Sequence, residues 1–256
     1  MNVKAKKHLG QHFLTDENIA KKIVEGLSFS GYSYALEVGP GTGVLTKYLL
    51  EKPIETFVAE IDTESIAYLK IHYPQLQEQH FTGDFLKINL SDVFNGEVAV
   101  IGNFPYNISS QILFKIIDHY QQIPEMVGMF QKEVAERTAA VPRTKDYGIL
   151  SVLVQAYYDV KYLFTVHENV FNPPPKVKSG VIRMTRNKKE GLEGNEVLFK
   201  QIVKTGFNQR RKKLSNALKP LNIPESIKNH LFMDKRAEEL SVEDFINFTI
   251  EWKAAL

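Results

Sequence analysis

The segment Gly102–Asn107, which reads Gly-Asn-Phe-Pro-Tyr-Asn, carries side chains suited to chemistry on the amino group of a nucleobase. An exocyclic amino nitrogen is a poor nucleophile because its lone pair is delocalised into the ring. Asn103 and the backbone carbonyls near Phe104 and Pro105 can accept hydrogen bonds from such an amine and localise its lone pair toward a sulfonium methyl group. The ring of Tyr106 can stack on the base, a contact worth about 1–3 kcal/mol. A core strand followed by a simple turn is the alternative interpretation.

A glycine-rich turn, Gly39-x-Gly41-x-Gly43, lies between an apolar run and a segment with helical spacing. Glycines at such a turn let a ligand approach the backbone beyond the carboxyl end of a strand. A dinucleotide fingerprint would place a further glycine where this chain has Val44, so the turn disfavours NAD without excluding it. Taken alone, a turn of this kind is more often only a tight chain reversal.

Two acidic residues follow the next two apolar segments. Glu60 ends the second expected strand, 21 residues after Gly39, where a carboxylate can accept hydrogen bonds from ribose hydroxyls. Asp84 follows Gly83 at the end of the third segment, where it could accept from an adenine amino group. Both could instead be solvated residues at strand ends. Three strand ends that match one nucleoside-shaped ligand favour the binding interpretation.

The elements that must position these residues follow from the hydrophobic pattern of the first 120 residues. Short apolar runs alternate with segments of helical spacing, a pattern typical of a parallel sheet covered by helices. We expect strands at residues 35–38, 56–61, 80–82 and 98–101. The matching helices are expected at residues 44–50, 66–71 and 112–117.

The pattern is weaker beyond residue 120. We expect strands at residues 126–130, 161–166 and 180–184 and a helix at 131–140, whereas residues 148–155 fit either element. The polar, glycine-containing segment Asn187–Gly194 is the best candidate for a linker. Short helices are expected at residues 198–206, 212–218, 224–231 and 242–252, and Ser241 with Asp244 resembles the start of the last one.

The composition, 43% hydrophobic and 24% charged, is that of a globular protein, and it excludes several kinds of chemistry. The chain has no cysteine, so disulfides, thiolate nucleophiles, Cys-based zinc sites and iron–sulfur clusters are ruled out. Its seven histidines show no His-Glu-x-x-His spacing, so we expect no metal. No apolar run approaches the roughly 18 residues of a membrane span, and the basic first fourteen residues lack the apolar stretch of a secretory signal. We therefore expect a cytoplasmic protein.

The charge is unevenly distributed along the chain. Residues 1–185 carry 18 basic and 20 acidic side chains, whereas residues 186–256 carry 14 basic and 10 acidic ones. Basic side chains cluster in two places: Lys4, Lys6 and Lys7 near the N-terminus, and Arg210, Arg211, Lys212 and Lys213 in the second part. Such clusters are usually solvated surface, but they can also neutralise nucleic-acid phosphates.

Four motifs occur in order along the chain: Gly10-Gln-His-Phe-Leu14, Glu37-Val-Gly-Pro-Gly-Thr-Gly43, Asn103-Phe-Pro-Tyr106 and Phe171-Asn-Pro-Pro-Pro-Lys-Val-Lys-Ser179. In this combination the chain resembles the small-subunit (16S) ribosomal RNA adenine N6,N6-dimethyltransferase family, and the resemblance extends from residue 8 to about residue 218. Each motif is modest alone, but together they are specific. One departure is Phe104, where the family more often has Leu. We expect little consequence, because that position is assigned a backbone role.

The resemblance implies an α/β fold. It is a Rossmann-like, class I S-adenosylmethionine-dependent methyltransferase sheet of seven strands, with a small all-helical C-terminal domain. We expect residues 1–185 to form the catalytic domain with its basic N-terminal arm, and residues 186–256 to form the helical domain that contacts rRNA.

The resemblance also implies roles for individual residues. His12 and Leu14 match the N-terminal motif that closes over the cofactor, S-adenosyl-L-methionine. The other residues matching cofactor-binding positions are Gly39 under the methionine moiety, Glu60 at the ribose, Asp84 at the adenine and Asn103. Residues matching the target-base site are Asn103, Pro105, Tyr106 and a second aromatic, Phe171. Lys4, Lys6, Lys7, Arg210, Arg211, Lys212 and Lys213 become candidates for rRNA contacts.

The expected reaction is direct in-line methyl transfer to adenine N6, repeated to give N6,N6-dimethyladenine, with no dedicated general base. One branch of the superfamily modifies two adjacent adenosines in the 3′-terminal hairpin of small-subunit rRNA, as a late step of subunit assembly. Another modifies one large-subunit adenine and confers antibiotic resistance. The segment Phe207–Leu218 and the complete Gly10–Leu14 motif resemble the small-subunit branch.

The expected partner is therefore small-subunit rRNA within an assembling subunit, and the protein is expected to be a monomer. Three alternatives remain at this point. The first is the large-subunit branch, and the second is a non-catalytic RNA-binding factor on the same fold, against which the intact cofactor motifs argue. The third is an NAD-dependent dehydrogenase, for which we find no acid/base candidate.

Overall fold

The computed structural model describes residues 3–189 and 192–256, and its chain divides into two compact units. The first comprises residues 1–135 and 160–186, and the second comprises residues 136–159 and 187–256. The predicted division at residues 185/186 assigned 136–159 to the catalytic domain, whereas contacts within the fold group this segment with the C-terminal residues. Part of the predicted linker, residues 190–191, lies outside the described residues.

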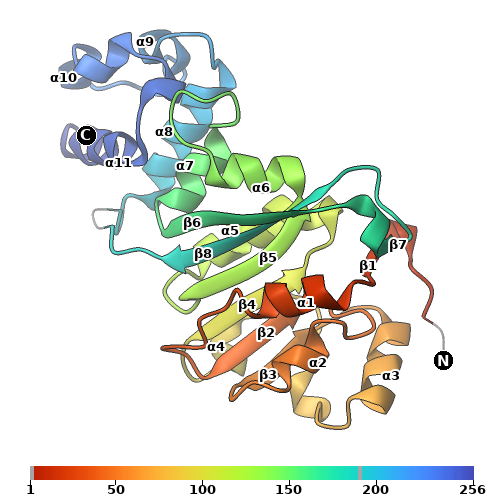
Figure 1. Ribbon diagram of the computed structural model, residues 1–256. Helices are drawn as coiled ribbons and strands as arrows, with labels where there is room; N and C mark the ends of the chain where they lie inside the picture. Colours follow the sequence, from red (N-terminus) through yellow and green to blue (C-terminus); the bar gives the residue numbers. More distant parts are fainter. Residues whose placement is uncertain (1–2, 190–191) are drawn as a thin grey trace. The chain divides into compact units, whose positions relative to one another are not determined.

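The first unit is built on a six-stranded sheet in which four neighbouring strands run parallel (Figure 1). Strand β8 pairs antiparallel with β5 and lies next to the edge strand β6. In spatial order the strands are β3 (Glu55–Ala59), β2 (Tyr34–Val38), β4 (Val98–Asn103), β5 (Glu125–Gln131), β8 (Ser179–Arg186) and β6 (Tyr158–Val166). The buried strands are almost continuously apolar, as expected for a parallel sheet covered on both faces.

The seventh strand that the resemblance implied is absent from the described part of the sheet. Residues 80–82 were expected to form it, but only Phe81 forms a parallel bridge, with Val58 on β3. The preceding residues form a 3-10 helix (Glu78–His80), and Gly83 follows with φ +79°. The segment is therefore too short to extend the ladder along β3.

The first unit contains the helices α1 (Glu17–Val24), α2 (Thr46–Leu49), α3 (Thr63–His72), α4 (Leu90–Val93) and α5 (Ser109–Asp118). The helices predicted at residues 44–50, 66–71 and 112–117 are present as α2, α3 and α5, whereas α1 and α4 were not predicted. In Figure 1, α1 crosses in front of the sheet and α5 lies behind it. The helix α6 (Lys132–Ala139) follows β5. Asp16 and Asp62 begin α1 and α3, because their carboxylates accept hydrogen bonds from backbone N–H groups of the first turn.

A short two-stranded sheet joins the N-terminal arm, residues 3–14, to a distant loop. Strand β1 (Phe13–Leu14) pairs antiparallel with β7 (Phe171–Asn172). Short 3-10 helices occur at Lys7–Leu9, Tyr106–Ile108 and Glu168–Val170. The main core of this unit includes Leu14, Ile23, Leu49, Ile101, Met129 and Phe171.

Helices make up most of the second unit, and those beyond residue 186 lie where the sequence predicted them. The helices are α7 (Ile149–Gln155), α8 (Glu196–Asn208), α9 (Leu214–Ala217), α10 (Glu225–Lys228) and α11 (Val242–Ala254), with 3-10 helices at Leu231–Asp234 and Ala237–Glu239. Residues 148–155, which fitted either element, are helical. The predicted start of the last helix is confirmed, because Ser241 Oγ accepts from Asp244 N at 3.0 Å and Asp244 Oδ2 accepts from Ser241 N at 2.8 Å.

Candidate functional site

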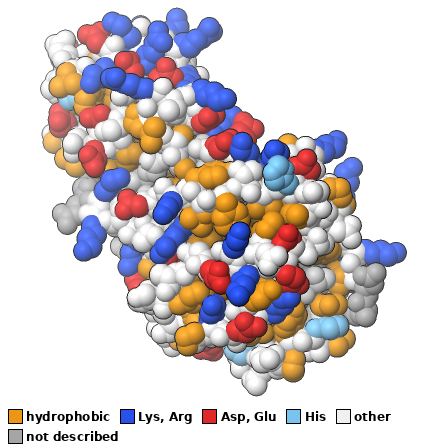
Figure 2. All heavy atoms as spheres, in the orientation of Figure 1, with side chains coloured by type: hydrophobic (Ala, Val, Ile, Leu, Met, Phe, Trp, Pro, Cys, Tyr) orange, Lys and Arg blue, Asp and Glu red, His pale blue; other side chains and the backbone are white. Residues whose placement is uncertain are grey.

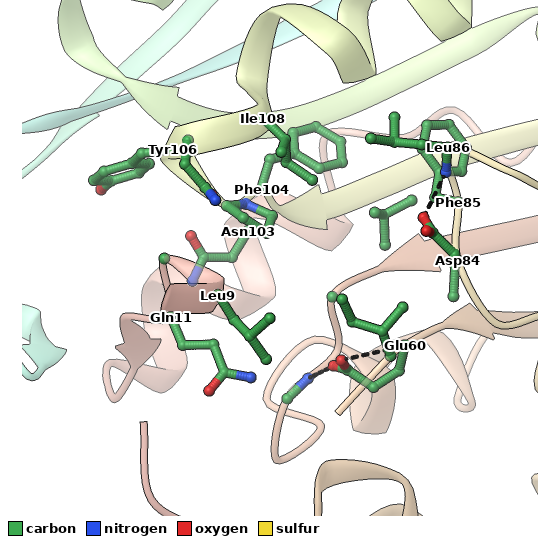
Figure 3. Close-up of a pocket in the computed structure, with 18 of the residues that line it drawn as sticks. Leu9, Gln11, Glu60, Asp84, Phe85, Leu86, Asn103, Phe104, Tyr106 and Ile108 are labelled. Atoms are coloured by element: carbon green, nitrogen blue, oxygen red, sulfur yellow. Dashed lines mark hydrogen bonds between the residues drawn. The ribbon is translucent and has the colours of Figure 1, made fainter. Parts of the chain in front are cut away.

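A cavity of about 870 Å³, including its part open to solvent, lies at the carboxyl ends of β2, β3 and β4. Its walls come from the ends of these strands, from the arm segment 9–13, from the segment 83–86 and from residues 104–108. Figure 3 shows Leu9 and Gln11 of the arm lying between Asn103 and Glu60. Seven residues predicted from distant parts of the sequence therefore line one cavity: His12, Gly39, Glu60, Asp84, Asn103, Pro105 and Tyr106. Its position at the carboxyl ends of parallel strands suits a nucleoside-containing ligand.

The glycine-rich turn forms part of the cavity wall and depends on its glycines. Gly39 and Gly41 have φ values of +70° and +55°, in the left-handed region that side chains disfavour. A Cβ atom on Gly41 would lie 2.7 Å from the ring of Phe13 in the arm. The turn therefore presents bare backbone to the cavity while the arm packs directly against it.

Glu60 is fixed by the backbone around it. Its Oε1 accepts from the N–H groups of Ile61 and Asp62 at 2.8 and 2.9 Å, and its Oε2 accepts from Gly41 N at 3.2 Å. Burial raises the pKa of the Glu60 carboxyl, and the three backbone N–H groups oppose that rise. The carboxyl is thus held rigidly at the position that the sequence assigned to ribose recognition.

Asp84 also lines the cavity (Figure 3) and is partly exposed. Its Oδ1 accepts from Leu86 N at 3.0 Å, and Lys87 Nζ lies 3.5 Å from its Oδ2. The carboxylate therefore retains acceptor capacity for a further donor.

Asn103 ends β4, and its amide is oriented by the arm. Its Nδ2 donates to the backbone carbonyl of His12 at 2.8 Å. A carbonyl can only accept, so Nδ2 must face His12 and Oδ1 must face away from it. Among the residues that the structure describes, none donates to this Oδ1. The oxygen is thus left as an acceptor for an external N–H group.

Tyr106 is held at its hydroxyl and at one face. Its OH lies 2.6 Å from Oγ of Ser179, which is fully buried at the start of β8. Its ring stacks on the imidazole of His12, with centroids 5.5 Å apart and planes inclined by 28°. The His12 Nδ1 lies 2.7 Å from the carbonyl of Pro173, which fixes the imidazole in turn. Burial raises the pKa of the Tyr106 hydroxyl.

The two residues between Asn103 and Tyr106 contribute differently. Phe104 is 1% exposed, and its ring occupies the space beside Gly128, where a Cβ atom would lie 2.0 Å from the ring. Its side chain therefore belongs to the core. The carbonyl of Pro105 already accepts from Ile108 N at 3.2 Å within the following 3-10 turn.

Leu14 and Phe171 are not among the residues that line the cavity. They face each other across the β1–β7 pair, and each is 4% exposed within the main core. The strand pairing directs both side chains into this core. Their predicted roles beside the cofactor and the target base stay predictions, whereas both side chains pack in the main core.

The basic residues near the N-terminus differ in their surroundings. Lys4 and Lys7 are exposed. Lys6 instead forms an ion pair with Asp62, and its Nζ lies 3.2 Å from Glu64 Oε1. The charge of Lys6 is thus already neutralised within the protein.

The second basic cluster is also partly paired, and Figure 2 shows many Lys and Arg side chains on the part of the molecule that holds α8–α10. Arg210 Nε lies 2.6 Å from Glu238 Oε2, and its other nitrogens donate to two backbone carbonyls. Lys213 lies 2.8 Å from Asp234. Arg211 and Lys212 are exposed and carry the free charge of this cluster.

Some polar residues at the site were not singled out from the sequence. Glu37 is 1% exposed and accepts a 2.6 Å hydrogen bond from Thr46 Oγ1. An acid inside the apolar run Ala35-Leu-Glu-Val38 was the signal that could have identified it. Ser179, which fixes Tyr106, ends the Phe171–Ser179 motif but was assigned no role from it. Asp62, a buried residue that fixes the arm, had no comparable local signal.

The donor and acceptor set fits S-adenosylmethionine. The glycine turn offers bare backbone for the methionine part, and Glu60 and Asp84 offer acceptors for hydroxyl and amino groups. Within residues 3–189 and 192–256, no cluster of His, Asp and Glu could hold a metal ion, and no helix is long and apolar enough to cross a bilayer.

Comparison with known proteins identifies relatives along almost the entire chain. The family model described as ribosomal RNA adenine dimethylase matches residues 2–254. The ribosomal RNA small subunit methyltransferase A of Flavobacterium johnsoniae is 59% identical over 248 residues, covering 96% of this chain and 95% of the relative. The protein of the same name from Cytophaga hutchinsonii is 58% identical, covering 96% of both chains.

Solved structures agree with these relatives. A dimethyladenosine transferase from Plasmodium falciparum has a TM-score of 0.81 and 27% identity, covering 95% of this chain and 98% of that one. The 23S rRNA methyltransferase ErmE has a TM-score of 0.70 at 22% identity, covering 94% of this chain and 99% of that one. The second likeness shows a shared fold.

Proposed function

The chain belongs to the ribosomal RNA adenine dimethylase family, and from this premise we propose that it dimethylates N6 of two adjacent adenosines in the 3′-terminal hairpin of 16S rRNA. The observation that carries the proposal is the amide of Asn103, whose Oδ1 is left free as an acceptor in a cavity that fits S-adenosylmethionine. The relatives named for the small subunit, at 58–59% identity, support this substrate over large-subunit rRNA.

When bound, S-adenosylmethionine supplies the electrophilic methyl group. The contribution of this chain is to orient the target amine and polarise its nitrogen. Asn103 Oδ1 accepts a hydrogen bond from the N6 amino group, which localises the nitrogen lone pair. The carbonyl of His12 keeps this oxygen in place by accepting from Nδ2 at 2.8 Å.

The protein supplies no dedicated base in this scheme. Methylation of the amine gives a cationic nitrogen that is acidic enough to lose its proton to water. The resulting neutral methylamine still carries one N–H group, which can donate to Asn103. The same geometry therefore serves the second methyl transfer.

The target adenine must leave its stack to reach the cavity, which costs a few kcal/mol and less for a loop base. Tyr106 offsets this cost by stacking, and its ring is fixed for that role by Ser179 and by His12. The proposed partner is small-subunit rRNA in an assembling subunit, modified at a late step of biogenesis. We place the enzyme in the cytoplasm, acting as a monomer.

The test compares Asn103→Ala and Asn103→Asp with the wild-type protein, using 16S rRNA in unmethylated small subunits. Both substitutions remove the amide that donates to His12, and we expect a loss of at least about a hundredfold in kcat for dimethyladenosine formation. Asn18→Ala, at an exposed position of α1, is the control and should keep full activity. Near-normal methylation by Asn103→Ala would refute the assignment. Binding of S-adenosylmethionine without methylation of any rRNA by the wild type would favour a non-catalytic RNA-binding factor.

A further inference from the structure

The N-terminal arm, residues 3–14, forms one wall of the cavity and is attached at two places, to Asp62 and to the Asn103–Tyr106 segment. Residues 9–13 line the cavity directly. Gly10, with φ +66°, packs so closely on Asn107 that a Cβ atom would lie 2.6 Å from its Oδ1. The arm therefore covers the site without being part of the sheet that builds it, and its attachments decide how firmly the cavity is closed.

The first attachment is made to Asp62, a buried carboxylate that directly follows the Glu60 turn. Lys6 Nζ pairs with Asp62 Oδ1, and Gln11 Nε2 donates to Asp62 Oδ2 at 3.2 Å. The side chain of Asp62 is fully buried, whereas that of Lys6 is 27% exposed. Burial opposes ionisation of this carboxyl, but the hydrogen bonds from Lys6, Gln11, the Glu64 backbone and Ser65 together outweigh burial and lower its pKa.

The arm is shaped to make this attachment. The backbone N–H of Lys6 donates to Gln11 Oε1 at 2.8 Å, so the two residues that hold Asp62 also hold each other. Leu9 N donates to the Lys6 carbonyl at 3.0 Å, which closes the intervening turn. Asp62 is equally fixed, because it begins α3 and its backbone N–H donates to Glu60 at 2.9 Å.

The second attachment is made to the residues that recognise the target base. The carbonyl of His12 accepts from Asn103, and its imidazole stacks on Tyr106. His12 directly follows Gln11, the residue whose side chain holds Asp62. The arm thus connects the Glu60 end of the cofactor cavity with the Asn103 amide.

From these contacts we propose that Lys6 and Gln11 are positioning residues, which pair with Asp62 to hold the arm over bound S-adenosylmethionine. The inference rests on the proposed function and assigns Lys6 to cofactor retention instead of rRNA contact. An rRNA phosphate would have to compete with the buried Asp62 carboxylate for the Lys6 ammonium. If the phosphate bound Lys6, the buried charge of Asp62 would lose this cation, which is energetically costly. The neighbouring Lys7 is exposed, so its charge is open to solvent.

The test measures S-adenosylmethionine binding by titration calorimetry and its dissociation rate by stopped flow, both without RNA. Lys6→Gln is expected to raise the Kd at least tenfold, mainly through faster dissociation. Lys6→Arg should restore most of the affinity, because it keeps the charge that pairs with Asp62. Lys7→Gln, which removes the same charge from the next residue, should change the Kd by less than twofold. Asp62→Asn, which retains the shape of the carboxylate, should weaken binding as Lys6→Gln does.

Thermal unfolding of each variant shows whether a loss of affinity reflects a loss of fold. A further variant, Gln11→Glu, tests the attachment to Asp62 while the ion pair between Lys6 and Asp62 is retained. This change replaces the donor at Asp62 with a like charge, so it should also raise the Kd. Unchanged cofactor affinity in Lys6→Gln, with a weaker salt dependence of rRNA binding, would overturn the proposal and return Lys6 to the rRNA-contacting residues. If Lys6→Gln and the wild-type protein bind S-adenosylmethionine equally well, only this inference fails. If the wild type does not bind it, the proposed function fails as well.

Discussion

Replacement of Glu37 by Gln should remove a large pH dependence from the stability of the first unit. Glu37 is 1% exposed on β2, its carboxyl accepts a hydrogen bond from the hydroxyl of Thr46, and the like charge of Glu60 lies nearby. Burial raises the pKa of this carboxyl to about 8, the hydrogen bond from Thr46 opposes the rise, and Glu60 adds to it. The folded protein therefore keeps a proton on Glu37 at neutral pH.

The sign of the effect follows from this proton. In the unfolded chain the carboxyl has its ordinary pKa of 4.5, so between pH 4.5 and about 8 the folded state binds a proton that the unfolded state has released. The free energy of unfolding must fall as the pH rises through this window. A pKa difference of one corresponds to about 1.4 kcal/mol, so the contribution of Glu37 should fall by about 3–4 kcal/mol between pH 5 and pH 8.

A glutamine side chain at this position would match the shape and neutrality of the protonated acid without titrating. The assay is urea unfolding of wild type and Glu37→Gln at pH 5, 6, 7 and 8, followed by far-ultraviolet circular dichroism. Fluorescence of Trp252 is less suitable because this residue belongs to the second unit. The variant should gain stability relative to wild type as the pH rises. Parallel pH profiles for the two proteins would refute the reasoning, because they would mean that Glu37 does not hold its proton in the folded state.

Three further predictions concern the cavity and the basic surface. Tyr106→Phe should lower the free energy of unfolding by about 1 kcal/mol, because the hydroxyl of Ser179 loses its hydrogen-bond partner. It should raise the KM for rRNA less than Tyr106→Ala does, because the phenylalanine ring can still stack on the base. Equal KM values in the two variants would contradict the stacking role. Gly41→Ala should weaken S-adenosylmethionine binding at least tenfold in calorimetry, because the added Cβ would lie 2.7 Å from the ring of Phe13 in the arm. Unchanged affinity would exclude this close packing. Joint replacement of Arg211 and Lys212 by Gln should lower the slope of log affinity for rRNA against log salt by about two, and an unchanged slope would make both residues ordinary solvated surface.

The sequence predicted the scaffold well because the hydrophobic pattern records burial locally. The apolar runs at residues 35–38, 98–101 and 126–130 became neighbouring strands of one sheet. Since the carboxyl ends of parallel strands meet at one edge, motifs as distant as Gly39 and Asn103 could be expected to share a site. Residues 148–155 could not be assigned in this way, because a largely apolar run of that length has the same pattern in a strand and a helix.

Pairings between distant side chains left no comparable trace in the sequence. Lys6 and Asp62 are 56 residues apart, and nothing in either neighbourhood indicates that one neutralises the other. Arg210 likewise pairs with Glu238, 28 residues further along the chain, and Lys213 pairs with Asp234. Two of the four basic residues at positions 210–213 are therefore paired within the unit. The ring of Phe171 lies in the core because β7 pairs with the arm, a contact that only the fold specifies.

The central claim is tested most directly by nucleoside mass spectrometry after incubation with S-adenosylmethionine. The substrates are small and large ribosomal subunits that lack native adenine methylation. Our account predicts N6,N6-dimethyladenosine in small-subunit rRNA alone, and its absence when Asn103→Ala replaces the wild type. Dimethyladenosine confined to large-subunit rRNA, or formed equally by Asn103→Ala, would contradict it.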